Sequence, residues 1–505
     1  MRYDVVVVGG GTSGCVLATR LSEDPAVSVL LIEAGGDERR ATVEVPDRWE
    51  ENLGTETDWQ YRTVPQPETG RAYDAPRGRV LGGSGSINCM THLRGHRLDY
   101  EEWERLGAAG WGYDGVLPYF KRSEDVPDGD PHYRGTGGPL HPRITEDPSA
   151  VGERFIASAL RLGHRRTEDF NAADMQGVGY SESLIRDGKR ESTATAYLRP
   201  AIGRPNLEVD TDARVVGLVL DGATCRGVRM VRDGAERVIE AGEVVLAAGA
   251  VGSPHLLMLS GVGPAGQLQA AGVRVVHDLS GVGANLQDHV LLTGVRYRAA
   301  RSVNDAGMGG AVLLTRIDDA EHGPDLLLNT MNIDYHMPWQ DGPVEHPVTF
   351  GIGHMRPHSR GSITLRSADP MVAPLIDPAY VRESADLDAL IRGVEIVEGI
   401  VQDGAFAEWG GSSDTTRILS QSRADVEAAV KDAVGSYFHL SGTCRVGVDA
   451  DAVVAPDLRV HGIDGLRVAD ASIMPVVVSC NTNAAAVMIG EKAADLVRGR
   501  AVGAP

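Results

Sequence analysis

The stretch Tyr3-Asp-Val-Val-Val-Val8-Gly9-Gly-Gly11-Thr-Ser-Gly14 decides the fold of this chain. Its first half is apolar and β-branched, as expected of a parallel strand that is buried on both faces. The glycines follow at once, and a helical pattern continues through residues 16–21. A second apolar run, residues 27–32, then ends at Glu33. A strand, a glycine-rich turn, a helix and a strand that ends in an acid together predict a dinucleotide-binding unit.

Each glycine of this turn has a different role in the predicted unit. Gly9 permits the tight turn, Gly11 lets the backbone approach a pyrophosphate, and Gly14 lets helix and strand pack closely. The helix N-terminus presents free N–H groups and partial positive charge to the phosphates. Glu33 can accept hydrogen bonds from a ribose and disfavours a 2′-phosphate, but the pattern does not distinguish FAD from NAD. The predicted contacts here are Gly9, Gly11, Thr12, Ser13, Gly14, Glu33 and Ala34.

The bulk properties exclude several classes of protein. A chain of 505 residues should form two or three lobes, because single cores stop growing at about 250–300 residues. A net charge of −21 disfavours a nucleic-acid partner or an anionic membrane surface. The five cysteines are scattered without metal-site spacing, so we predict neither a disulfide framework nor a metal. With no room for a signal peptide before Tyr3 and no apolar run long enough to span a bilayer, we expect a cytoplasmic protein.

Three more segments have patterns of their own. Residues 78–88 read Gly-Arg-Val-Leu-Gly-Gly-Ser-Gly-Ser-Ile-Asn, a run of small residues that suits contact with a flat ring or a phosphate, or else forms a flexible surface loop. Residues 244–263 read as a buried strand followed by a short helix that stops at a glycine. Residues 281–289 read Gly-Val-Gly-Ala-Asn-Leu-Gln-Asp-His.

The last seventy residues carry the candidate chemistry. They contain His439-Leu-Ser-Gly-Thr443, then a strand-like segment that ends at Asp470, then Asn481-Thr-Asn483. Imidazole is the side chain whose ordinary pKa lies nearest neutrality, so His439 is the candidate proton acceptor.

Together these segments resemble the glucose–methanol–choline (GMC) family of flavin oxidoreductases over nearly the whole chain. Residues 249–263 are similar to the family's second signature at every constrained position. Residues 78–88 are similar to most of the first signature, although His92 stands where an aromatic residue or alanine is usual. The segments 356–361, 377–378 and 481–483 are also typical of the family.

The resemblance implies an α/β fold in which a Rossmann-like FAD-binding domain is assembled from separated segments. A substrate-binding domain built on an antiparallel sheet is inserted between them. We accordingly assign residues 1–150, 191–290 and 435–505 to the FAD-binding domain, and residues 151–190 and 291–434 to the substrate-binding domain. The further cofactor contacts that it implies are Arg79, Gly82, Gly83, Ser84, Asn88, Ala248, Gly249, Asp470, Ala471 and Asn483.

The implied reaction is the FAD-dependent oxidation of an alcohol, with hydride transfer to flavin N5. The resemblance places His439 as the base and Asn481 as its partner, at a position that is histidine or asparagine in the family. An amide can donate a hydrogen bond to the developing alkoxide but cannot accept its proton. Asn483 is predicted to cap the last helix, whose positive end would face the flavin. Asp470 is predicted either to lie near the ribityl and phosphate groups or to cap a helix.

Several features of the site stay open at this point. Ile87 aligns with the histidine that tethers FAD in some relatives, so we predict non-covalent FAD. Leu440 replaces a common proline and changes either the backbone or the pocket. We also expect His354 to line the substrate pocket, whereas the roles of Asn285 and Asp288 are undecided.

The substrate is the other open question. We expect a small alcohol, most simply a primary one, with dioxygen or another electron acceptor. The alternatives are a sugar or choline oxidase or dehydrogenase of the same family, and a hydroxynitrile-lyase-type flavoprotein without net redox chemistry. A flavin-binding module without catalysis is disfavoured because His439 and Asn481 are both present. Sequence separates neither oxidase from dehydrogenase nor one oligomeric state from another.

Overall fold

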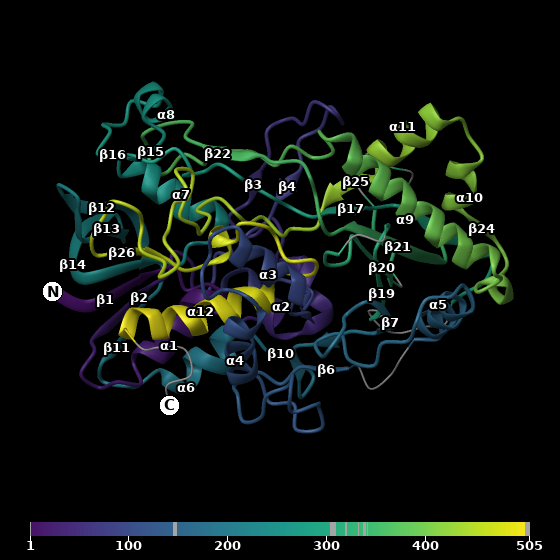
Figure 1. The fold of residues 1–505 in the computed structure, drawn as a ribbon, viewed down its shortest axis with the longest axis horizontal. Coiled ribbons are helices and arrows are strands. Elements are labelled where there is room, and N and C mark those ends of the chain that lie inside the picture. The colour runs from purple at the N-terminus through teal and green to yellow at the C-terminus, as the bar shows by residue number, and fades with distance from the viewer. Residues whose placement is uncertain are drawn as a thin grey trace.

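Two β-sheets organise the chain, and a computed structural model places them at opposite ends of the molecule (Figure 1). The structure describes residues 2–144, 149–303, 310–318, 321–331, 333–336, 340 and 342–499. Within these ranges, no helix combines the length and the apolar character needed to cross a membrane.

The first sheet has seven strands in the order β11-β2-β1-β14-β13-β12, with β26 also paired to β14. The β1, β2, β11 and β26 strands pair in parallel, whereas β12 and β13 extend the sheet in antiparallel fashion. The valines of β1 are almost completely buried, as predicted for a strand covered on both faces. The strands are β1 (Arg2–Val8), β2 (Val29–Ile32), β11 (Leu207–Asp210), β12 (Arg214–Asp221), β13 (Thr224–Arg232), β14 (Ala235–Leu246) and β26 (Leu466–Val468).

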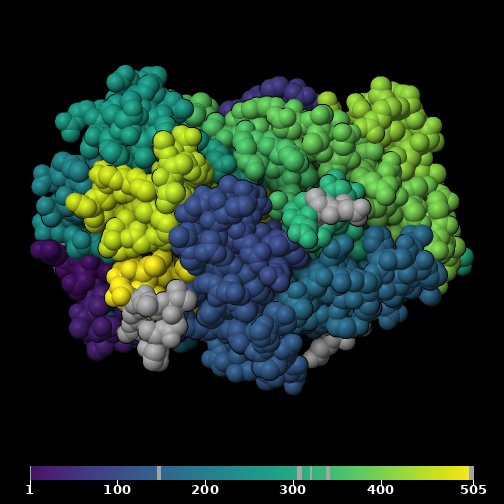
Figure 2. Space-filling model, viewed as in Figure 1, coloured from purple at the N-terminus to yellow at the C-terminus, as the bar shows by residue number. Residues whose placement is uncertain are grey.

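The two ends of the chain come together beside this sheet. Helix α1 (Thr12–Leu21) packs along α12 (Asn483–Arg498), and both contribute buried apolar side chains to the same core (Figure 1). Figure 2 shows the C-terminal part of the chain in yellow, between purple N-terminal residues and the blue segment near residue 100. Helix α7 (Gly249–Leu259) follows β14 and is largely buried.

The second sheet has eight strands and is antiparallel throughout. One of its faces packs against helices α5 (Ala150–Arg161) and α9 (Ser384–Gln402) in a separate apolar core. The opposite face of this sheet is turned toward the first sheet. The strands are β7 (Gly177–Tyr180), β17 (Val290–Leu292), β18 (Arg296–Arg298), β19 (Ala311–Thr315), β20 (Leu326–Met331), β21 (Pro347–His354), β24 (Ser412–Ser413) and β25 (Val434–Ser436).

Shorter elements cover the two sheets. The remaining α-helices are α2 (Ala41–Glu44), α3 (Arg97–Arg105), α4 (Tyr113–Ser123), α6 (Arg199–Ala201), α8 (Ala265–Ala270), α10 (Asp414–Leu419) and α11 (Arg423–Ala433). The remaining strands are β3 (Tyr61–Arg62), β4 (Asp74–Ala75), β5 (Thr91–His92), β6 (Arg143–Ile144), β8 (Glu182–Ser183), β9 (Ile185–Arg186), β10 (Lys189–Arg190), β15 (Val262–Gly263), β16 (His277–Asp278), β22 (Ser362–Thr364) and β23 (Leu375–Asp377).

The predicted fold class is confirmed. A Rossmann-like sheet is assembled from segments that are far apart in sequence, and an antiparallel sheet is inserted between them. The exact domain bounds stay a prediction, and strand β25 extends across the boundary proposed at residue 435.

We predict that Gly14→Ala destabilises the protein, because a methyl group at Gly14 would lie 1.9 Å from the Gly9 carbonyl oxygen. Overpacking of this kind typically costs about 1–3 kcal/mol, so the melting temperature should fall by roughly 1–3 °C in a chain of this length. Gly266→Ala in helix α8 is the matched control, since a methyl group there meets nothing within 4 Å. Equal melting temperatures for the two variants would show that close packing at Gly14 is unimportant.

Candidate functional site

A cavity of about 430 Å³ has walls from both sheets. The first sheet contributes residues that follow its parallel strands, and the second contributes side chains of β17, β19 and β20. Sixteen predicted site residues, which are scattered through the sequence, therefore meet at one cavity. They are Gly9, Gly11, Thr12, Ser13, Glu33, Ala34, Gly83, Ser84, Asn88, Ala248, Gly249, His439, Asp470, Ala471, Asn481 and Asn483.

Helix α1 begins at this cavity with an exposed backbone. Gly9 has a φ of +101°, and a methyl group there would lie 2.6 Å from the Ala247 carbonyl oxygen. A methyl group at Gly11 would instead meet its nearest atoms only at 3.8 and 3.9 Å. No side chain caps the helix. The backbone at Gly11 is therefore open to a bound group, and the donors of the first turn suit an anionic pyrophosphate.

Two more helices begin at the same cavity. Residues at the N-terminal ends of α7 and α12 line its wall. The Thr12 hydroxyl donates to Asn483 Oδ1 at 3.0 Å, which joins the starts of α1 and α12. Three helix N-termini give this wall a positive potential.

The predicted N-cap of the last helix was wrong by one residue. Thr482 occupies the cap position with helical backbone angles, and Asn483 is the first helical residue. The Asn483 side chain turns to Thr12 instead of capping its own helix.

Asp470 caps a short helix, which is one of the two roles that the sequence left open, and it also borders the cavity. Its Oδ1 accepts from the Ser472 backbone N–H at 2.8 Å, which caps a short 3₁₀ helix (Ala471–Ile473). Its Oδ2 accepts from the Gly249 N–H at 2.9 Å and from the Ser253 hydroxyl at 2.6 Å. The carboxylate thus ties the start of α7 to the end of β26 while it borders the cavity.

Glu33 is held at the cavity wall by two backbone donors. The N–H groups of Gly10 and Gly35 each donate to one of its carboxylate oxygens at 2.8 Å. Burial nevertheless raises the pKa of Glu33 to about 7, although these hydrogen bonds and the Arg79 charge oppose the shift. The remaining lone pairs of the carboxylate can accept from ribose hydroxyls.

His439 and Asn481 meet at the other end of the cavity. The amide Nδ2 of Asn481 lies 3.3 Å from Nε2 of His439, and Nδ1 of His439 lies 2.9 Å from Nδ1 of His289. Because an amide nitrogen only donates, Nε2 of His439 accepts and its ring proton lies on Nδ1. The proton on Nδ1 is then donated to His289. This arrangement directs the basic lone pair of His439 toward Asn481 and the cavity.

The backbone of His439 is fixed by a buried carboxylate. Asp288 Oδ1 accepts from the His439 N–H at 2.6 Å. Asp288 Oδ2 accepts from the hydroxyls of Tyr380 at 2.5 Å and Ser436 at 2.6 Å. Arg77 donates to the carbonyl of Phe438, whose φ is +64°. Hydrogen bonds on both sides of Phe438 therefore hold this unusual backbone in place.

Burial keeps both imidazoles neutral. It lowers the pKa of His439 well below its ordinary value, and the nearby His289 and Arg77 lower it further. Burial likewise lowers the pKa of His289 to about 3, with a smaller contribution from His354. The Tyr437 ring stacks on the His439 ring at 4.8 Å.

His289, Arg77 and Tyr437 had no role in the sequence analysis. His289 was quoted within residues 281–289, but it lies 150 positions before His439, and no local pattern relates residues at that distance. Asp288, whose role was left undecided, positions the backbone of His439.

Some predicted residues do not reach the cavity wall. Gly14 packs against Gly9, Gly82 adopts a φ of +86°, and the Arg79 guanidinium lies over the Trp59 ring at 5.6 Å. The expectation for His354 was wrong, because its Nε2 lies 3.2 Å from Asp386 Oδ1, away from the cavity. Both Ile87 and Leu440 border the cavity, and the effect of leucine in place of proline at residue 440 stays a prediction.

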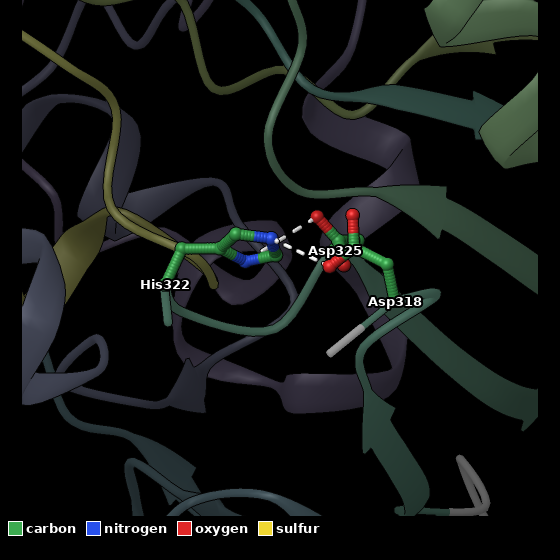
Figure 3. A group of neighbouring side chains, drawn as sticks. All are labelled: Asp318, His322 and Asp325. Atoms are coloured by element: carbon green, nitrogen blue, oxygen red, sulfur yellow. Dashed lines mark hydrogen bonds and ion pairs between the residues drawn. The ribbon is translucent and has the colours of Figure 1, made fainter. Parts of the chain in front are cut away.

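A group of potential metal ligands, Asp318, His322 and Asp325, lies near strand β20 (Figure 3). His322 Nε2 lies 3.1 Å from Asp318, and its Nδ1 lies 2.6 Å from the Gly323 carbonyl oxygen and 3.6 Å from Asp325. Asp325 also accepts from the Ile317 N–H. Each ring nitrogen of His322 therefore lies beside an oxygen acceptor of a neighbouring residue.

A Rossmann-like sheet, three helix N-termini at one cavity and a neutral histidine at its end define a dinucleotide-binding oxidoreductase. The chain matches the N-terminal GMC oxidoreductase family model over residues 3–291 and the C-terminal one over residues 357–490. It therefore belongs to the GMC oxidoreductase family, as the sequence predicted. The protein is an FAD-dependent oxidoreductase that acts on CH–OH groups.

Similar proteins match this chain over nearly its whole length. Oxygen-dependent choline dehydrogenase of Brucella anthropi is 36% identical over 99% of this chain and 96% of its own length. The crystal structure of pyridoxine 4-oxidase from Mesorbium loti has a TM-score of 0.94 and 34% identity, and covers 99% of this chain and 100% of that one. Formate oxidase from Aspergillus oryzae has a TM-score of 0.90 and 28% identity, with 99% and 98% coverage.

We predict that FAD affinity decreases as the pH falls through about 7, because ribose binding needs the ionised Glu33 carboxylate and the pKa of Glu33 is raised to about 7. Glu33→Gln should weaken FAD binding roughly tenfold through one lost backbone hydrogen bond and abolish this pH dependence. Titration of the apoprotein with FAD between pH 6 and 8 measures both effects. Glu236→Gln, at an exposed position, is the control; a pH dependence that survives in Glu33→Gln would contradict the assignment.

Proposed function

We propose that this protein oxidises a primary alcohol to an aldehyde and that His439 is the base. The observation that carries the proposal is the orientation of the His439 ring. Its Nδ1 is engaged by His289, and its Nε2 lies beside Asn481 at the cavity wall. A neutral imidazole held in this orientation is suited to accept a hydroxyl proton, which typically contributes about 10²–10⁴-fold to the rate.

Asn481 completes the proposed alcohol site. Its Nδ2 can donate to the substrate oxygen as negative charge develops there, and it cannot compete with His439 for the proton. Its Oδ1 is buried without a hydrogen-bond partner among the described residues. Together the two side chains position the hydroxyl and remove its proton, while Tyr437 covers one face of the His439 ring.

The residues at the other end of the cavity fit FAD. The open backbone at Gly11 and the starts of α1, α7 and α12 would hold the pyrophosphate and flavin, and Glu33 would hold the ribose. Bound FAD supplies the acceptor for the hydride that leaves the alcohol carbon. Ile87 borders the cavity with a hydrocarbon side chain, which supports non-covalent attachment.

The names of the relatives suggest two substrate classes. Pyridoxine is an aromatic alcohol and choline is a cationic aliphatic one, and this chain resembles an enzyme named for each. A panel of aliphatic, aromatic, sugar and choline alcohols, mixed anaerobically with the holoenzyme, tests the reaction class by bleaching of the flavin. Peroxide formation in air then shows whether dioxygen is the acceptor. An absence of bleaching by every alcohol would favour a lyase without net redox chemistry.

The cysteines support the proposed cytoplasmic location. All five are free, and four of them are buried. A protein that builds its fold without disulfides is suited to a reducing compartment.

We predict that His439→Asn slows flavin reduction roughly 10²–10⁴-fold, while the visible flavin spectrum shows that FAD remains bound. In the unmodified protein the rate should stay constant between pH 8 and 6, because the lowered pKa of His439 keeps the base unprotonated there. The rate should decrease only at more acidic pH, where His439 becomes protonated. Stopped-flow absorbance measures both effects, and a decline centred near pH 7 would argue against His439 as the base.

We predict different effects for the two asparagines at the end of the chain. Asn481→Ala should slow flavin reduction, because it removes the amide beside His439 Nε2. Asn483→Ala should mainly change the flavin spectrum or its retention, because this side chain joins the starts of α1 and α12. Rates and absorbance spectra of both variants, measured side by side, distinguish the roles. The reverse pattern would exchange the assignments.

A further inference from the structure

One wall of the cavity is a face of the antiparallel sheet, and the side chains on this face would contact a bound substrate. Side chains alternate along β20, so that Leu327, Asn329 and Met331 line the cavity while Leu326 and Leu328 join the core beneath α9. Leu291 of β17 and Val312 of β19 lie on the cavity side as well. The lining positions of these three strands are therefore apolar except for Asn329.

Glycines of the neighbouring strand make room for this wall. Asn329 lies opposite Gly351 in the pairing of β20 with β21, and Leu327 lies opposite Gly353. A methyl group at Gly351 would lie 2.1 Å from Asn329 Oδ1, and one at Gly353 would lie 2.5 Å from the Tyr437 ring. The two glycines thus accommodate the Asn329 amide and the aromatic ring that stacks on His439.

The Asn329 amide is a polar group of this wall whose side-chain oxygen bonds to no described residue. Its Oδ1 is buried and has no hydrogen-bond partner among the described residues, although Asn329 itself borders the cavity. A buried amide oxygen that makes no hydrogen bond is destabilising. A ligand that donates a hydrogen bond to this oxygen would remove the penalty, so the Asn329 amide is better satisfied with substrate bound than without it.

Asn329 and Tyr437 lie on the same face of the sheet, because each lies against one of two glycines that are two residues apart on β21. Gly353 contacts Tyr437, which stacks on His439, and Gly351 contacts Asn329 two residues away. An alcohol bound along this face could therefore direct its hydroxymethyl group toward His439 and a ring substituent toward Asn329.

Resting on the function proposed above, we propose that the sheet wall selects an uncharged, ring-bearing primary alcohol. Asn329 is its specificity-determining residue and binds a hydrogen-bonding substituent remote from the reacting carbon. The apolar side chains Leu291, Leu327 and Met331 contact the ring. They disfavour choline, because transfer of a cation to an apolar wall is costly without a carboxylate partner. The lining positions of β17, β19 and β20 carry no carboxylate, and Glu182, which borders the cavity beside them, is already paired with Arg134.

The test compares 4-hydroxybenzyl alcohol with benzyl alcohol in the holoenzyme and in Asn329→Leu. The unmodified protein should prefer the hydroxylated substrate about tenfold in the second-order rate constant of anaerobic flavin reduction. Asn329→Leu should abolish this preference while it retains or improves reduction by benzyl alcohol. Choline should reduce the flavin less efficiently than either aromatic alcohol.

A matched control separates specificity from folding. Thr330→Val lies on the opposite face of the same strand, is fully buried and is nearly isosteric, so it should leave the preference unchanged. Gly351→Ala, whose methyl group would displace the Asn329 amide, should reduce the preference in the same direction as Asn329→Leu.

Calorimetric binding of 4-hydroxybenzaldehyde and benzaldehyde gives a second readout that needs no turnover. Loss of the tenfold binding ratio in Asn329→Leu supports the inference even if no alcohol reduces the flavin, an outcome that would overturn only the proposed reaction. Equal substrate and aldehyde ratios in the unmodified protein and Asn329→Leu would overturn the inference while leaving alcohol oxidation intact. A choline rate above both aromatic alcohols would overturn the selection for uncharged rings.

Discussion

The pairing of β14 with both β1 and β26 is the constraint on which the site depends. Leu246 lies opposite Val8 on one side and opposite Val468 on the other, so three parallel strands end at the same level. The glycine turn, the start of α7 and Asp470 follow these strands directly. In open α/β sheets, ligands bind in the crevice outside the carboxyl ends of the parallel strands. Segments that are more than 200 residues apart therefore form one cofactor wall.

A second constraint fixes the end of the cavity where His439 and Asn481 lie. Asp288 is a buried carboxylate that accepts from a backbone N–H and two hydroxyls. Burial raises the pKa of Asp288, whereas these hydrogen bonds and Arg77 oppose that shift. The resulting network fixes the His439 backbone, and His289 fixes its ring. In the function proposed above, a base that is neutral and already oriented before substrate binds would need little reorganisation during the reaction.

Much of the proposed cofactor site could be predicted from the sequence, because its residues belong to patterns that are short and continuous in the chain. The turn Gly9–Gly14, the acid at the end of β2 and the strand–helix segment around Gly249 all follow from residues close together in the chain. Predictions were less accurate where two distant segments compete for one side chain. Asn483 suits a helix cap by its chemistry, but it is used by Thr12 because α1 and α12 begin at the same place. His354 likewise binds Asp386 instead of the cavity.

The sequence by itself determined the family and the fold class, because several motifs stand in the order typical of that family along nearly the whole chain. That resemblance also singled out FAD and the pair His439 and Asn481. Only the tertiary structure decided that His289 orients the His439 ring and that Asn329 is the polar side chain of the sheet wall. Both depend on strand register and on contacts between distant segments. Strand pairing is specified by burial of the whole sheet, so a single strand cannot show which residue will lie opposite it.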